Sequence, residues 1–175
     1  SEAPELMRIG GKATRSIWVT DGGASVSIID QTRLPHELAV RALATAEEAA
    51  EAIRVMQVRG APLIGAAAAY GIWLAMRRNA SGGALEAAAA LLARQRPTAV
   101  NLAWAVGEML KALRPLPPEE RPAAALAKAQ AIADDDVETC RQIGAHGLAL
   151  IREASARKPP GEPVNILTHC NAGWL

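Results

Sequence analysis

The residue of this chain best suited to acid–base or covalent chemistry is Cys170. It follows residues 164–169, a short apolar run after Pro163 that is typical of an inner strand of a parallel sheet. A cysteine at the carboxyl end of such a strand lies where open α/β sheets bind ligands. The backbone amides of residues 171–173 favour the binding of an anion, or a lowered pKa of the cysteine thiol. His169 joins Cys170 in one pocket only if the turn begins early, because neighbouring strand side chains face opposite sides. The alternative is that Cys170 is a small hydrophobic residue of the core.

A second candidate site consists of Arg59, Gly60 and Ala61, at the predicted start of a helix. Pro62 suits the first turn of that helix. The unpaired amides of a helix start carry partial positive charge, Gly60 lets the backbone come close to a ligand, and Arg59 adds a planar cationic fork. Such a corner binds phosphate or carboxylate. The alternative is an ordinary corner between two helices with a surface arginine.

Arg96 belongs to a third candidate site, residues 94–101, where basic residues again precede a helix start. Thr98 is the predicted N-cap of this helix. Two such corners could converge on one anion, with Arg59 at one and Arg96 at the other. The alternative is an arginine that complements the end of one helix and a proline that begins the next.

The remaining polar residues give weaker signals. The histidines and cysteines show none of the usual zinc spacings, so no metal site is predicted from His36, His146, His169, Cys140 and Cys170. Residues 134–136 are three consecutive aspartates, which point in three directions on a helix and indicate a solvated face. Glycine-rich motifs for dinucleotides or phosphates are absent.

Composition limits the classes of partner. The net charge is +1, Phe is absent and aromatic residues make up 3% of the chain, which argues against nucleic acid and acidic membranes. Half of the residues are hydrophobic, so a sizeable core can form. Two cysteines do not make a disulfide framework, and reduced thiols in the cytoplasm are expected. Residues 61–76 are apolar but shorter than the roughly 20 residues that span a bilayer, and no signal peptide is evident.

The patterning predicts a small sheet followed by helices. Residues 16–20 and 24–29 flank Asp21-Gly22-Gly23 and are expected to form a hairpin. Thr45 and Glu48 form a capping box at the start of a helix that ends at Gly60. The buried stripe expected for that helix is Ala49, Ile53 and Met56, or Ala52 and Met56.

Further helices are predicted along the rest of the chain, with prolines and glycines between them. Their expected ranges are 62–77, 84–94, 98–113 and 119–156, the last as one helix or a pair. The fold class is therefore α/β, with a mostly helical domain over residues 1–157 and a proline-rich linker over 158–163. Residues 164–175 are expected to begin a Rossmann-like domain whose remainder is absent from the chain.

Four motifs occur in an order that resembles a known family. They are residues 29–35 (Ile-Asp-Gln-Thr-Arg-Leu-Pro), 58–65 (Val-Arg-Gly-Ala-Pro-Leu-Ile-Gly), 96–102 (Arg-Pro-Thr-Ala-Val-Asn-Leu) and 168–173 (Thr-His-Cys-Asn-Ala-Gly). Together they closely resemble the methylthioribose-1-phosphate isomerases. That family is related to the alpha, beta and delta subunits of translation initiation factor 2B, which lack the full set of motifs.

The resemblance implies an aldose–ketose isomerase of methionine salvage, which converts 5-methylthioribose 1-phosphate to 5-methylthioribulose 1-phosphate. It implies a cytoplasmic homodimer, a phosphorylated pentose as substrate and no metal or organic cofactor. It assigns substrate binding to Arg59, Gly60, Ala61 and Arg96, and catalysis to Cys170. The family's catalytic aspartate lies beyond the last residue of this chain, so the chain alone is expected to be inactive.

Two other functions remain open at this stage. One is a sister isomerase acting on ribose 1,5-bisphosphate or 5-deoxyribose 1-phosphate. The other is a non-catalytic regulatory subunit like those of initiation factor 2B, against which the turn bearing Cys170 argues.

Overall fold

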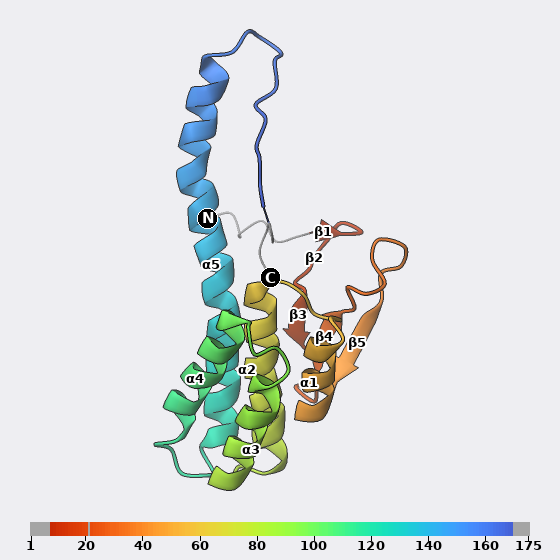
Figure 1. Cartoon of the computed structure of the whole chain (residues 1–175), viewed down its shortest axis with the longest axis vertical. Coiled ribbons are helices and arrows are strands. Elements are labelled where there is room, and N and C mark those ends of the chain that lie inside the picture. Colours follow the sequence, from red (N-terminus) through yellow and green to blue (C-terminus); the bar gives the residue numbers. More distant parts are fainter. Residues whose placement is uncertain (1–7, 21, 170–175) are drawn as a thin grey trace.

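The computed structural model describes residues 8–20 and 22–169 of the chain. Within these residues, two small antiparallel sheets precede five helices (Figure 1). The larger sheet lies on one side of a helical body built around α2, and α5 extends well beyond that body (Figure 1). The predicted α/β class, with a few antiparallel strands and then helices, is confirmed.

The larger sheet has the strand order β3-β4-β5, with β3 at Ile17–Val19, β4 at Val26–Ile29 and β5 at Val40–Leu43. Strands β3 and β4 form the predicted hairpin, in which Ile17 lies opposite Ile28. Strand β5 was not predicted from the sequence. Because β4 is central, all four of its residues are buried rather than alternately exposed. The smaller sheet pairs β1 (Arg8–Ile9) with β2 (Lys12–Ala13).

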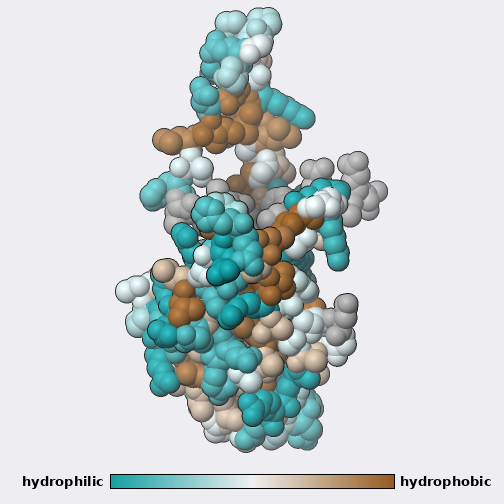
Figure 2. Space-filling model, turned by 90° about the vertical axis from the view of Figure 1, so that its right-hand side faces the viewer, coloured by the Kyte–Doolittle hydropathy of each residue, from teal (hydrophilic) through white to brown (hydrophobic). Residues whose placement is uncertain are grey.

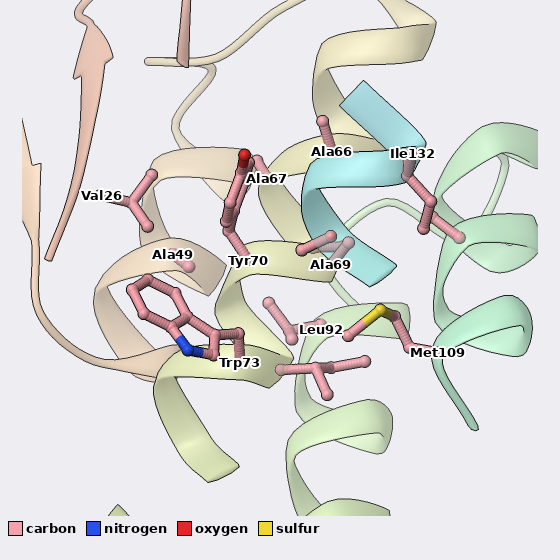
Figure 3. Close-up of a cluster of buried hydrophobic side chains, with 14 of the residues drawn as sticks. Val26, Ala49, Ala66, Ala67, Ala69, Tyr70, Trp73, Leu92, Met109 and Ile132 are labelled. Carbon is pink, nitrogen blue, oxygen red and sulfur yellow. The ribbon is translucent and has the colours of Figure 1, made fainter. Parts of the chain in front are cut away.

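Helix α2 is the centre of the core. It runs from Ala61 to Arg78, begins with a first-turn proline as predicted, and is covered by the other helices and by β3. A Cβ atom on Gly71 would lie 3.0 Å from the Cβ of Ala49 and 3.0 Å from Leu92, so the missing side chain allows this close approach. Figure 3 shows Tyr70 and Trp73 among side chains from the sheet and the surrounding helices. The other helices are α1 (Ala46–Arg54), α3 (Gly82–Ala93), α4 (Val100–Leu113) and α5 (Arg121–Ala156).

The start of α1 confirms the predicted capping box, but its end differs from the prediction. The amide of Glu48 donates to Thr45 Oγ1 at 3.1 Å, and Glu48 Oε2 accepts from the Thr45 amide at 3.3 Å. The helix ends at Arg54, not at Gly60, because Met56 takes a left-handed conformation with φ 60°. The stripe residues Ala49, Ala52 and Ile53 are buried, whereas Met56 is about half exposed.

Two other helix starts differ from the sequence prediction. Ala99, not Thr98, is the N-cap of α4, and no side chain caps this helix. Ser81 begins α3 by accepting a hydrogen bond from the Ala84 amide, so residues 81–83 start a helix rather than only ending one. Both differences amount to one or two residues at a helix end, where boundaries are least defined.

Helix α5 is a single helix of 36 residues that is followed by an irregular segment. Residues 164–169 form no strand in the described chain, and Asn165 to His169 are exposed. A parallel strand needs hydrogen-bonded neighbours, and within the described residues nothing pairs with this segment. The predicted linker and the predicted Rossmann-like strand therefore remain predictions.

Candidate functional site

Three of the four sequence motifs meet at the amino end of α2. The first motif reaches the residue just before the second, because the Gln31 amide donates to the Gln57 carbonyl at 2.9 Å. Asp30 holds the first motif in place because its buried carboxylate accepts from the amide and the hydroxyl of Thr32, at 3.1 and 2.6 Å. Arg41 Nε lies 3.4 Å from the other oxygen of Asp30. The loop after β4 is thus fixed beside the turn that contains Arg59.

The third motif meets the second at the first turns of two helices. A Cβ atom on Gly65 of α2 would lie 3.0 Å from the carbonyl oxygen of Asn101 in α4. Both helices begin at the same end of the helical body (Figure 1). Because helix starts carry partial positive charge, this end of the molecule presents two such charges close together.

The predicted substrate-binding residues lie at this end and are accessible. Arg59 and Ala61 are exposed, and Gly60 and Arg96 are partly exposed. Gly60 is the N-cap of α2 with φ 93°, a conformation that favours glycine, and no side chain caps the helix. Among the described residues, neither arginine side chain takes part in a hydrogen bond or ion pair. The residue types, their exposure and the helix starts suit an anionic ligand.

A groove of about 450 Å³ lies beside the two helix starts. Its apolar wall includes Trp104, which is half exposed, and its polar wall comes from α4 and α5. The lining residues are Pro62, Val100, Asn101, Trp104, Ile132, Asp135, Asp136 and Thr139. The sequence does not reveal this groove, because its residues come from three helices and only Pro62, Val100 and Asn101 belong to the motifs.

A larger hollow lies elsewhere in the described chain. It measures about 860 Å³ and is lined by α3, the carboxyl end of α2 and the start of α1, with many alanines. Arg94 belongs to this hollow, although its neighbour Arg96 does not line it. Neither hollow is lined by the predicted substrate-binding residues themselves, but the groove includes Pro62 and Asn101 of the second and third motifs, so it is the better candidate.

The thiol of Cys140, which follows the groove residue Thr139 on α5, is not activated as a nucleophile. The pKa of the Cys140 thiol is raised by partial burial and by the charge of Asp136, so this thiol stays protonated at neutral pH. Asp134, the first of the three aspartates, pairs with Arg15 at 2.5 Å, which agrees with a surface role. In the described part of the chain, no cluster of three or more histidine, cysteine or acidic residues is placed to hold a metal ion.

The predicted catalytic residue Cys170 lies outside the described residues, so its distance from Arg59 and Arg96 is untested. The adjacent His169 is exposed at the end of the extended segment. Within the residues that the structure describes, no helix has the length and apolar character needed to cross a bilayer.

The fold and these motifs define a class of protein. The model of the initiation factor 2 subunit family matches residues 57–175, and the chain belongs to that family.

Two curated relatives are named methylthioribose-1-phosphate isomerase. The one from Methylocella silvestris is 56% identical to this chain and the one from Brucella anthropi is 53% identical, each over 97% of the chain and 46% of the relative. The chain therefore spans about half the length of the curated relatives it matches.

Two solved structures share the fold. The 5-methylthioribose 1-phosphate isomerase of Pyrococcus horikoshii matches with a TM-score of 0.74 and 36% identity, over 83% of this chain and 42% of that one. Subunit delta of the translation initiation factor eIF-2B from A. fulgidus matches with a TM-score of 0.70 and 42% identity, over 78% and 41%.

Proposed function

We propose that this chain is the amino-terminal part of an isomerase that converts 5-methylthioribose 1-phosphate to 5-methylthioribulose 1-phosphate. The observation that carries the proposal is the 56% identity to a relative of that name over nearly the whole chain. The meeting of three motifs at one end of α2 supports it, because a phosphorylated sugar needs an accessible cationic corner.

Phosphate binding is the role proposed for the corner at α2. Arg59 and the amides of Gly60 and Ala61 would hold the phosphate group, with Arg96 as a second cation. Both arginines are accessible and have no ion pair among the described residues, so neither must give up a partner to bind an anion. The apolar wall of the adjacent groove, with Trp104, suits the apolar end of the sugar.

The chemistry requires ring opening and a hydrogen shift. A phosphate on C1 locks the pentose as a ring, so the open aldehyde is not freely accessible to the enzyme. The enzyme must help to open the ring and move hydrogen from C2 to C1, which calls for an acid–base pair and a fixed phosphate. Cys170 would act near C1 or C2 as an acid–base group or by stabilising the transition state.

The rest of the proposal concerns the whole protein. Residues 164–175 would begin a Rossmann-like domain, and Cys170 would lie at its ligand-binding edge with a partner aspartate from later in that domain. The enzyme would be a cytoplasmic homodimer that uses no metal or organic cofactor.

A regulatory subunit is the second candidate function. The 42% identity to subunit delta of eIF-2B from A. fulgidus favours it, since that identity exceeds the 36% found for the Pyrococcus isomerase structure. A protein of this kind would bind a phosphosugar or nucleotide without converting it.

A chimaeric protein can test the proposed function. It joins this chain, after Leu175, to the part of the Methylocella silvestris relative that lies beyond the matched region. We expect it to turn over 5-methylthioribose 1-phosphate faster than ribose 1,5-bisphosphate or 5-deoxyribose 1-phosphate. Binding of the phosphosugar without turnover would support the regulatory candidate instead.

Two cysteines allow a matched comparison within that chimaera. Cys170→Ser is expected to lower kcat by about 100-fold or more while the substrate still binds, as for loss of an acid–base group. Cys140→Ser should leave turnover unchanged, because that thiol lies on α5 and stays protonated. Normal turnover of the Cys170→Ser protein would remove the catalytic role.

A further inference from the structure

The larger sheet has an apolar outer face. Ile28 of β4 belongs to the core, so its neighbours Ser27 and Ile29 face the other side of the sheet. Trp18 lies opposite Ser27, and Val40 lies opposite Ile29, so these four residues share the outer face. The solvent face of an antiparallel sheet is normally polar. A face that carries a tryptophan and two aliphatic side chains is typical of a surface that contacts a ligand or partner.

A pocket of about 720 Å³ lies against this outer face, and we call it the sheet pocket. Trp18, Ser27, Ile29 and Val40 all line it, together with residues from β1, from β2 and from the segment that follows β2. Ile29 is 4% exposed and Val40 is 53% exposed, so the pocket has a buried floor and an open rim. Figure 2 views the molecule from the side on which the sheet lies and shows hydrophobic atoms there among hydrophilic ones. The volume is typical of small-molecule sites, which span about 300–1,000 Å³.

The floor of the sheet pocket contains a hydroxyl group without a partner. Ser27 is 7% exposed, and its hydroxyl makes no hydrogen bond to any residue that the structure describes. By contrast, the hydroxyls of Thr20 and Ser25 bond to each other at 3.0 Å. Most buried polar side chains have a hydrogen-bond partner. The Ser27 hydroxyl is therefore free to bond to a ligand in the pocket.

The charges around the sheet pocket favour an anion. Lys12 lines the pocket, is exposed and takes part in no ion pair within the described chain. Arg15, the other cation of the lining, pairs with Asp134 at 2.5 Å. None of the described residues that line the pocket is acidic. A negatively charged group beside Lys12 therefore meets an unpaired cation and no carboxylate of the lining.

We propose that the sheet pocket binds a small aromatic carboxylic acid that carries a ring N–H or a hydroxyl group. The ring lies against Trp18 and Ile29, its polar atom bonds to the Ser27 hydroxyl, and the carboxylate pairs with Lys12. A sugar phosphate suits this pocket less well, because the floor is apolar. The sheet pocket shares no lining residue with the groove beside Pro62, so the two sites can be tested separately.

An NMR titration of the 175-residue chain with indole-3-acetate tests the site. This probe has an aromatic ring, a ring N–H and a carboxylate, and we expect one-to-one binding with a Kd of about 1 mM or tighter. Lys12→Gln should weaken binding by about fivefold or more, and Ser27→Ala by about threefold or more. Both variants should fold, because neither side chain has a polar partner in the described chain.

Two matched probes separate the contributions of the two residues. Indole-3-acetamide has no charge, so it should bind more weakly than the acid and should not respond to Lys12→Gln. Naphthalene-1-acetate has no ring N–H, so it should not respond to Ser27→Ala. Lys111→Gln is the control substitution, since that side chain is 82% exposed on α4 and does not line the pocket.

Three outcomes would overturn the proposal. The first is no binding of indole-3-acetate, or binding that neither Lys12→Gln nor Ser27→Ala weakens, because the probe is then held elsewhere. The second is equal affinity for the acid and the amide, which contradicts an anion site. The third is loss of binding in the chimaera, since the rest of the protein then covers the pocket, whereas retained binding supports the site. Isomerase turnover enters none of these measurements, so failure of the proposed function leaves them unchanged.

Discussion

The two halves of α5 have similar apolar spacing but different surroundings. Residues 121–137 pack against α2 and α4, and Ala125 and Ala129 are fully buried there. Residues 138–156 carry Ile143 and Leu150 at equivalent positions, yet both are mostly exposed. The sequence of a helix therefore selects the face to be buried, whereas burial itself depends on what lies opposite.

The largest expected difference between the halves concerns two arginines. Arg121, in the covered half, is buried and donates to three carbonyls, those of Leu113, Leu116 and Ala80, at 3.2, 3.1 and 2.8 Å. Arg121→Ala removes three hydrogen bonds of a buried side chain and its packing, and we expect the free energy of unfolding to fall by about 2–4 kcal/mol in urea titrations.

Arg141 provides the matched control in the open half. It is exposed and, among the residues that the structure describes, pairs with Glu138 of the same helix. Arg141→Ala should leave the unfolding midpoint unchanged within error, because exposed ion pairs contribute little. Similar effects of the two substitutions would contradict the contrast between the halves.

Two glycines sharpen the comparison because their replacement should change stability in opposite directions. Gly71→Ala places a methyl group 3.0 Å from both Ala49 and Leu92, and overpacking of this kind lowers stability by about 1–3 kcal/mol. Gly147→Ala meets no described atom and should raise the stability of the 175-residue chain by about 0.5–1 kcal/mol. Thermal unfolding of the two variants measures both signs, and a destabilising Gly147→Ala would show that this face is already covered.

Alkaline pH gives a further test, through a tyrosine of α2, which packs against α5. Burial raises the pKa of Tyr70 to about 12, with the charge of Asp134 acting in the same direction and that of Arg15 against it. Because the unfolded pKa is about 10, the unfolded state loses its proton first, and stability declines as pH rises from 10 to 12. The loss should approach about 1.4 kcal/mol per pH unit in that window.

Tyr70→Phe is the control for this titration. The variant should show a flatter dependence of unfolding free energy on pH above 10, since only the tyrosine contribution is removed. Tyr70 is the single tyrosine of the chain, so its ionisation can also be followed by ultraviolet difference absorbance. A phenolate that forms near pH 10 in the folded protein would contradict burial of this ring.

Elements whose signals are local were predictable. The hairpin around residues 21–23, the capping box of Thr45 and Glu48, and the helix start at Pro62 depend on contacts within a few residues. The end of α1 was not predictable, because Met56 adopts a left-handed conformation that no glycine signals. Strand β5 was missed because its pairing with β4 is decided by a neighbour distant in the chain.

The candidate site, too, was predictable only in part. The sequence alone identified the residue types and motifs around Arg59 and Arg96 and the family they resemble, since these are short-range patterns. Only the tertiary structure decided that the first three motifs meet, through Gln57 and through Asn101 against Gly65, and that a groove lined by Trp104 adjoins them. It also decided which half of α5 is buried, because burial is a property of surfaces in contact and not of one segment.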